Sequence, residues 1–244
     1  MNFQQVDALL GSPQINFAMI PDSTQRLNQG MIITAVDNYW GAGEFMYGRY
    51  SAAIRQGGLC SVTPVFDSTL NAMRFDFAEV ANTANQACMC AVANQAGVTG
   101  NYGWFQITGL AVVNSTASVA AGSAIGIGAV GQAGAVTASK QVLNAKAITP
   151  ATQTVVINNC SGLNNALQIR VPKSDGWFAG AYLSGTGIQA GTTIVSIDPS
   201  TRIVTLSLAT NALVSGPITA TYNNGTVFYN VVHLNRPFLQ GAIT

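Results

Sequence analysis

The residue types that most often carry catalysis are few in this chain and unevenly spread. Seven of its nine acidic residues lie at or before Glu79, and none lies between Glu79 and Asp175. The one histidine, His233, falls within an apolar pattern typical of a strand. General acid–base and nucleophilic chemistry rely on carboxylates, histidine or an activated nucleophile. No Gly-x-Ser-x-Gly turn is present either. We therefore expect His233 to be structural, no catalytic residues, and a protein that is not an enzyme.

A glycine motif at 126–131 has the spacing of a dinucleotide-binding loop, Gly-Ile-Gly-Ala-Val-Gly. Such a loop follows a strand, opens a helix and is answered by an acid about 20 residues later. Here the next residues, 132–135, are poor helix formers, and the next acid is Asp175. The sequence therefore favours turn glycines and predicts no bound cofactor.

Four cysteines are spaced irregularly, and a chain of 244 residues does not need a disulfide framework. A metal site would need a second close pair or further histidines, so we expect no metal. Cys88 and Cys90 have the spacing of one strand face. Buried free thiols are predicted for Cys60, Cys88, Cys90 and Cys160.

The composition is apolar but poorly charged. Hydrophobic residues make up 48% of the chain and charged residues 8%, against roughly 25% charged in a typical domain. The net charge is +1 and the basic residues are scattered, so nucleic-acid binding is not expected. The most apolar stretch, 107–136, is broken by polar residues and glycines, so no membrane span or signal segment is expected. Such a surface suits a protein docked in an assembly.

From Gly43 onward, short runs of aromatic and β-branched residues alternate with Gly, Asn and Ser. This pattern predicts an all-β fold, an antiparallel sandwich or barrel. One stretch, 68–81, is compatible with a short helix as well as with strand and loop. The clearest hairpin is 192–207, around an Asp-Pro-Ser-Thr turn.

The chain changes character near Thr149-Pro150. Residues 1–40 contain two prolines without helical periodicity and predict an extended N-terminal arm. Residues 151–221 read as a small β-module. A strong strand follows it and is expected to return to the first domain, which would then comprise 41–150 plus 222–244.

Two further patterns admit a binding or modification role. Three triplets fit the glycosylation motif, at Asn114, Asn159 and Asn224, and are expected by chance in an Asn/Thr-rich chain. Several aromatic residues could form a carbohydrate platform, although core packing is favoured: Tyr39, Trp40, Tyr47, Tyr50, Tyr102, Trp104 and Trp177.

Three segments resemble phage head decoration proteins. Residues 39–47 (YWGAGEFMY) are similar to the opening strand of that family, 102–109 (YGWFQITG) to its central strand, and 232–241 (VHLNRPFLQG) to its closing segment. Separately, 183–198 (LSGTGIQAGTTIVSID) is similar to a β-module of phage and bacterial surface proteins.

The resemblance implies a capsid-bound domain, a projecting module and homotrimers on the shell, with no catalytic residues to transfer. The expected function is therefore a structural virion protein that binds the outer surface of a phage capsid, with the major capsid protein and its own copies as partners. The alternative is a receptor- or glycan-binding fibre or adhesin that recognises a host-surface glycan through 151–221. A polysaccharide depolymerase using Asp175 or Asp198 is disfavoured by the scarcity of carboxylates.

Overall fold

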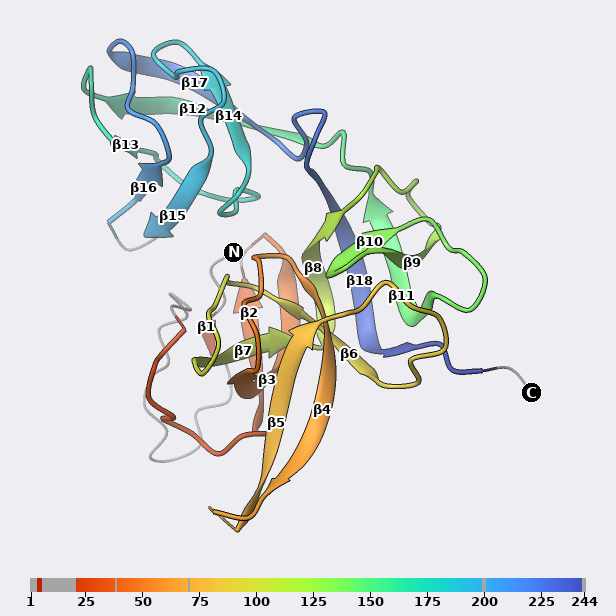
Figure 1. Cartoon of the computed structure of the whole chain (residues 1–244). Helices are drawn as coiled ribbons and strands as arrows, with labels where there is room; N and C mark the ends of the chain where they lie inside the picture. The colour runs from red at the N-terminus through yellow and green to blue at the C-terminus, as the bar shows by residue number, and fades with distance from the viewer. Residues whose placement is uncertain (1–3, 6–20, 38, 70, 199–200, 243–244) are drawn as a thin grey trace. The chain divides into compact units, whose positions relative to one another are not determined.

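The computed structural model describes residues 4–5, 21–37, 39–69, 71–198 and 201–242 (Figure 1). Every regular element in this part of the chain is a strand, which confirms the predicted all-β class. The chain forms two compact units. One comprises the described residues of 3–151 together with 227–244, and the other comprises 152–226. The described residues contain no helix of the length and apolarity that a membrane crossing requires.

The first half of the larger unit is a closed ring of five strands. In ring order these are β3 (Gly41–Tyr50), β5 (Ala72–Glu79), β4 (Leu59–Asp67), β6 (Met89–Ala93) and β7 (Tyr102–Gln106), which pairs back with β3. The β3–β5 contact is parallel and the other pairings are antiparallel. Large side chains fill the ring, and the stacked rings of Phe77 and Phe105 have centroids 3.7 Å apart. The helical alternative for 68–81 is wrong, because β5 pairs along its whole length with β4.

Part of the predicted N-terminal arm belongs to this sheet. β2 (Ile32–Asp37) pairs residue by residue with β3, and β1 (Gln4–Gln5) pairs with β2. Asp22 also forms an isolated bridge with Tyr102. Residues 32–37 are therefore a sheet strand and not an arm, because Ile33 and Ala35 are buried in the sheet. Residues 6–20 of the predicted arm lie outside the described residues.

The second half of the larger unit is another closed ring. β8 (Thr108–Ser115), β18 (Phe228–Leu239), β11 (Gln141–Thr149), β9 (Ala124–Ala129) and β10 (Gln132–Gly134) follow one another, and β10 returns to β8. Aliphatic side chains such as Val113, Ile125 and Val232 form its core. The rings share strands: β7 runs into β8 through Ile107, and β6 pairs with β18.

The glycine motif at 126–131 lies in a β-hairpin of the second ring, where β9 turns into β10. Gly131 donates from its N–H to the carbonyl of Val80 and accepts from the N–H of Leu59, both at 2.9 Å. Its φ is +66°, and a Cβ there would lie 2.5 Å from the carboxyl of Glu79. That carboxyl is held by Arg55 through two hydrogen bonds of 2.8 and 2.9 Å. The turn therefore needs glycine in order to dock the second ring against the first.

A buried amide secures the start of β18. The Asn230 side chain is fully buried and donates to the carbonyls of Val119 (3.0 Å) and Thr149 (3.1 Å), and it accepts from the Val119 N–H (3.3 Å). Thr149 ends β11 and pairs with Val231. Asn230 therefore fixes the place where the chain leaves this unit for 152–226 and returns.

The smaller unit is a six-stranded antiparallel sheet. Its order is β14 (Tyr182–Gly185), β17 (Val214–Thr221), β12 (Thr154–Gly162), β13 (Gln168–Arg170), β16 (Ile203–Leu206) and β15 (Ile194–Asp198). A bridge between Tyr182 and Thr193 brings the two edges of the sheet together. The predicted 192–207 hairpin is present as β15–β16, while Pro199 and Ser200 of its turn lie outside the described residues.

Aromatic packing in the core of the smaller unit extends beyond the C-terminal bound that the sequence predicted. Trp177, Phe178 and Tyr222 are buried, and the Tyr222 hydroxyl donates to the Gly176 carbonyl at 2.8 Å. The sequence predicted a module of 151–221, whereas the compact unit spans 152–226 and includes Tyr222, whose ring packs against Phe178.

Replacing Gly131 by alanine is expected to lower the free energy of unfolding by about 3 kcal/mol, because left-handed strain and a clash with Glu79 add together. Gly100→Ala is the matched control. Its φ is +89°, but a Cβ there meets nothing within 4 Å, so only about 1 kcal/mol of strain is expected. Urea unfolding measures both, and equal losses would contradict the docking role of Gly131.

Replacing Asn230 by alanine leaves the Val119 and Thr149 backbone groups without their partner in a buried place. The free energy of unfolding is expected to fall by about 3 kcal/mol. Asn235→Ala, on the exposed face of the same strand, is expected to change stability by less than about 0.5 kcal/mol. If both variants unfold at the same urea concentration, Asn230 does not secure the strand.

Candidate interaction surfaces

The carboxylates of the described residues are held in local contacts. Five ion pairs or groups are formed on the two units, and two more carboxylates accept backbone N–H groups in turns. The partners are Asp22–Arg26, Glu44–Arg236, Glu79–Arg55, Asp67 and Asp76 with Arg74, Asp175–Lys173, Asp37 with the N–H groups of Tyr39 and Trp40, and Asp198 with the N–H of Thr201. Six of the seven acidic residues up to Glu79 therefore have a structural role. The seventh, Asp7, lies outside the described residues.

The structure does not gather the remaining predicted chemistry into one site. His233 lies on β18 as expected, but its side chain is exposed on the outer face, opposite Leu110 and Lys146. Within the described ranges, no group of three or more His, Cys, Asp or Glu residues could hold a metal ion.

Most members of the suggested aromatic platform are in the core. Trp40, Tyr47, Tyr50, Trp104 and Trp177 are all buried. Burial raises the pKa of the Tyr50 hydroxyl, and the rings of Tyr47 and Trp104 pack 5.2 Å apart. Core packing, which the sequence favoured, is therefore the role of these five residues.

The glycosylation triplets also include structural residues. Asn114 is buried and its side chain binds Gln132. Asn224 precedes Gly225, whose φ is +89°, and accepts a hydrogen bond from the Thr226 N–H at 2.9 Å. Asn224 and Gly225 therefore form a turn, as the sequence indicated.

The four thiols are free. Cys60, Cys90 and Cys160 are buried and Cys88 is half-buried. Cys90 lies in β6 within the core of the second ring, and Cys88 packs against the same core from the residue before β6, so the two do not share a strand face. Burial raises the pKa of all four thiols.

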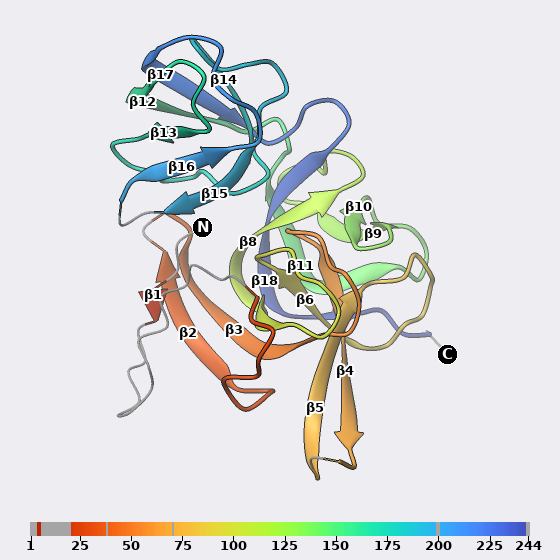
Figure 2. The ribbon, with the colours of Figure 1, turned by 60° about the vertical axis from the view of Figure 1, so that its left-hand side comes forward.

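One projecting element is amphipathic. The distal parts of β4 and β5 extend beyond the ring as a two-stranded ribbon, seen in both views (Figures 1 and 2). Val62 and Phe77 pair where the ribbon leaves the core, and Phe66 pairs with Met73 farther out. Because strand side chains alternate, Val62 and Phe66 share a face, as do Phe77 and Met73. Phe66 is 60% exposed and Met73 52% exposed, so the apolar face of the core continues onto uncovered ribbon.

The opposite face of the ribbon is polar. Arg74 donates to both carboxylate oxygens of Asp76 at 2.9 and 3.0 Å and to Asp67 at 3.0 Å. Arg49 lies 3.8 Å from Asp76. This network links the polar side chains of one face of the ribbon, whereas Phe66 and Met73 on the other face are uncovered. The sequence did not single out Phe66 or Met73 as surface residues, because apolar residues in a strand pattern are expected to be buried.

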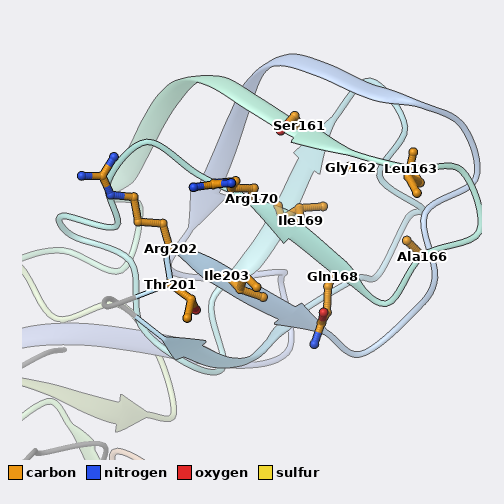
Figure 3. A pocket seen from close by; sticks show the side chains of 10 residues that line it. All are labelled: Ser161, Gly162, Leu163, Ala166, Gln168, Ile169, Arg170, Thr201, Arg202 and Ile203. Carbon is orange, nitrogen blue, oxygen red and sulfur yellow. The ribbon is translucent and has the colours of Figure 1, made fainter.

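A shallow groove lies on the smaller unit. It encloses about 900 Å³ over the outer face of β12, β13 and β16 (Figure 3). Arg170 and Arg202 extend toward one end of it, and Leu163 and Ala166 lie at the other. A recognition role for 151–221 was the alternative expected from the sequence, but no residue of this groove was predicted to take part in it.

The chain matches no protein-family model, no curated protein and no solved structure. The surfaces above therefore have to be interpreted from their own chemistry.

Thiol modification tests the burial of the cysteines. The thiolate is the reactive form, so a raised pKa leaves less of it at mildly alkaline pH. Iodoacetamide is expected to modify Cys88 slowly and the other three thiols only after unfolding in concentrated guanidinium chloride. Mass spectrometry of the intact chain counts the labels. Rapid labelling of two or more thiols in the folded protein would contradict this packing.

Proposed function

We propose that this chain is a structural virion protein that binds the outer surface of a phage capsid as a decoration subunit. Its partners would be the major capsid protein and two further copies of itself. The observation that carries the proposal is the amphipathic β4–β5 ribbon, with its uncovered Phe66–Met73 pair.

The ribbon supports attachment through apolar burial. Full burial of a large apolar side chain contributes about 1.5–3 kcal/mol, and more than half of Phe66 and Met73 is exposed. Covering both would strengthen a contact by roughly a hundredfold. The ion pairs of Arg74 hold the ribbon face in place, so little ordering is needed on docking.

The low content of charged residues and the pairing of most described carboxylates support a role as a subunit of a larger assembly. Only 8% of residues are charged, and most described carboxylates already have a basic partner on their own unit. Trimers, which the family resemblance implies, would multiply the ribbon contact because linked sites bind with higher effective concentration. The segments that carry the resemblance lie in β3, in β7–β8 and in β18.

Binding to the particle tests the ribbon. Phe66→Ser with Met73→Ser is expected to weaken binding to capsids assembled without this chain, from the phage that encodes it, by about a hundredfold, roughly tenfold per side chain. Cosedimentation with such capsids measures the dissociation constant. Both side chains are exposed, so circular dichroism and urea unfolding are expected to be unchanged.

A matched pair on another surface is the control. Leu143 pairs with Phe238 on the second ring, and they are 37% and 40% exposed. Leu143→Ser with Phe238→Ser is expected to retain capsid binding. If this variant lost capsid binding and the ribbon variant did not, the contact would lie on β11 and β18 of the second ring and not on the ribbon. Absence of the chain in stoichiometric amounts from purified particles would sink the proposal as a whole.

The second candidate function is recognition of a host-surface ligand by the module. The groove with Arg170 and Arg202 favours it. Recognition and attachment would use different units of the chain, so the two functions are compatible.

A further inference from the structure

We infer that the groove on β12, β13 and β16 binds a saccharide that carries carboxylate groups, such as an acidic surface polysaccharide. This inference does not depend on capsid attachment. It rests on two arginines that have no partner among the described residues, and on the hydroxyl and amide side chains that line the same groove.

The two arginines carry the charge recognition. Arg170 lies on the outward face of β13, opposite Ser161 on one side and Ile203 on the other. Arg202 precedes β16, and its carbonyl accepts the N–H of Val171 at 3.0 Å. Figure 3 shows both side chains directed to the same end of the groove. A guanidinium binds a carboxylate through two parallel hydrogen bonds, so this end suits an anionic group.

Neither guanidinium is neutralised by a described residue of the chain. Among the described residues, neither Arg170 nor Arg202 forms an ion pair or a side-chain hydrogen bond. By contrast, Lys173 on the same unit pairs with Asp175 at 3.5 Å. No acidic residue lines the groove. Arg202 also has a φ of +60°, an unusual conformation for arginine, which a turn glycine or asparagine would adopt more readily.

The rest of the lining suits a sugar. Ser161, Gln168 and Thr201 offer hydroxyl and amide groups for sugar hydroxyls. The volume of about 900 Å³ falls within the range of ligand sites, roughly 300–1,000 Å³, so it accepts a few sugar rings.

A nucleic acid fits this lining less well. Single-stranded nucleic acids are bound by several cations along the backbone and by aromatic rings that stack on bases. The described residues that line the groove include two arginines and no aromatic residue. A carboxylated saccharide requires only one or two anion contacts and a row of neutral hydrogen-bonding groups, which is what the groove provides.

Titration calorimetry of the full chain with tetragalacturonate tests the inference. Binding is expected, and full methyl esterification of the saccharide is expected to weaken it at least tenfold, because the ester removes the charge and keeps the ring hydroxyls. Arg170→Gln and Arg202→Asn are each expected to weaken it about tenfold. Asparagine is chosen at 202 because it tolerates a positive φ.

Two controls make the result decisive. Lys173→Gln removes the same charge from the same unit outside the groove and is expected to retain binding. The Phe66→Ser, Met73→Ser chain is also expected to bind the saccharide normally, so failure here is separable from failure of capsid attachment. Three results overturn the inference: no binding of tetragalacturonate, equal loss in Lys173→Gln, or tighter binding of poly-L-glutamate, which would assign the groove to an acidic peptide.

Discussion

Closure of strands into rings is the constraint on which the rest of this structure depends. An open sheet edge presents unpaired N–H and C=O groups, which proteins often guard with charged side chains. Only 8% of the residues of this chain are charged, so few charged side chains could protect sheet edges. In the larger unit, β7 returns to β3 and β10 returns to β8, and in the smaller unit the Tyr182–Thr193 bridge joins the edges. Closure therefore leaves the projecting ribbon as a prominent exception, and this is why we propose it as the contact element.

Buried amides make that closure possible where the chain bends. Gln106 is fully buried and donates to the carbonyls of Thr108 and Leu110, both at 2.9 Å, at the point where β7 becomes β8. Asn230 does the same for β18. Bends in a sheet leave carbonyls without strand partners, and an unpaired buried carbonyl is costly. The neutral side chains of Gln106 and Asn230 thus provide hydrogen-bond donors for these buried carbonyls, and no charged group is needed.

The sequence predicted the class of fold because strand periodicity and turn residues are local signals. The β15–β16 hairpin and the core role of Trp104 and Trp177 followed from such signals. β11 and β17 were not predicted, because many of their residues are small or polar and their partners β18 and β12 are distant in the sequence. β2 was also missed, although it forms a hairpin with β3, because it lies within the segment that was predicted to be an arm. The same limit applies to the surfaces. Phe66 and Met73 resembled core residues, and Arg170 and Arg202 converge only in the folded sheet.

The smaller unit leaves and rejoins the chain at neighbouring positions. Thr149 pairs with Val231 on one side of the junction, and Thr154 pairs with Thr221 on the other. Paired strand residues lie about 5 Å apart, so a two-residue turn is long enough to connect the ends in place of the whole unit. Exchange at this junction therefore replaces the whole smaller unit and leaves the strand pairings of the two rings unbroken.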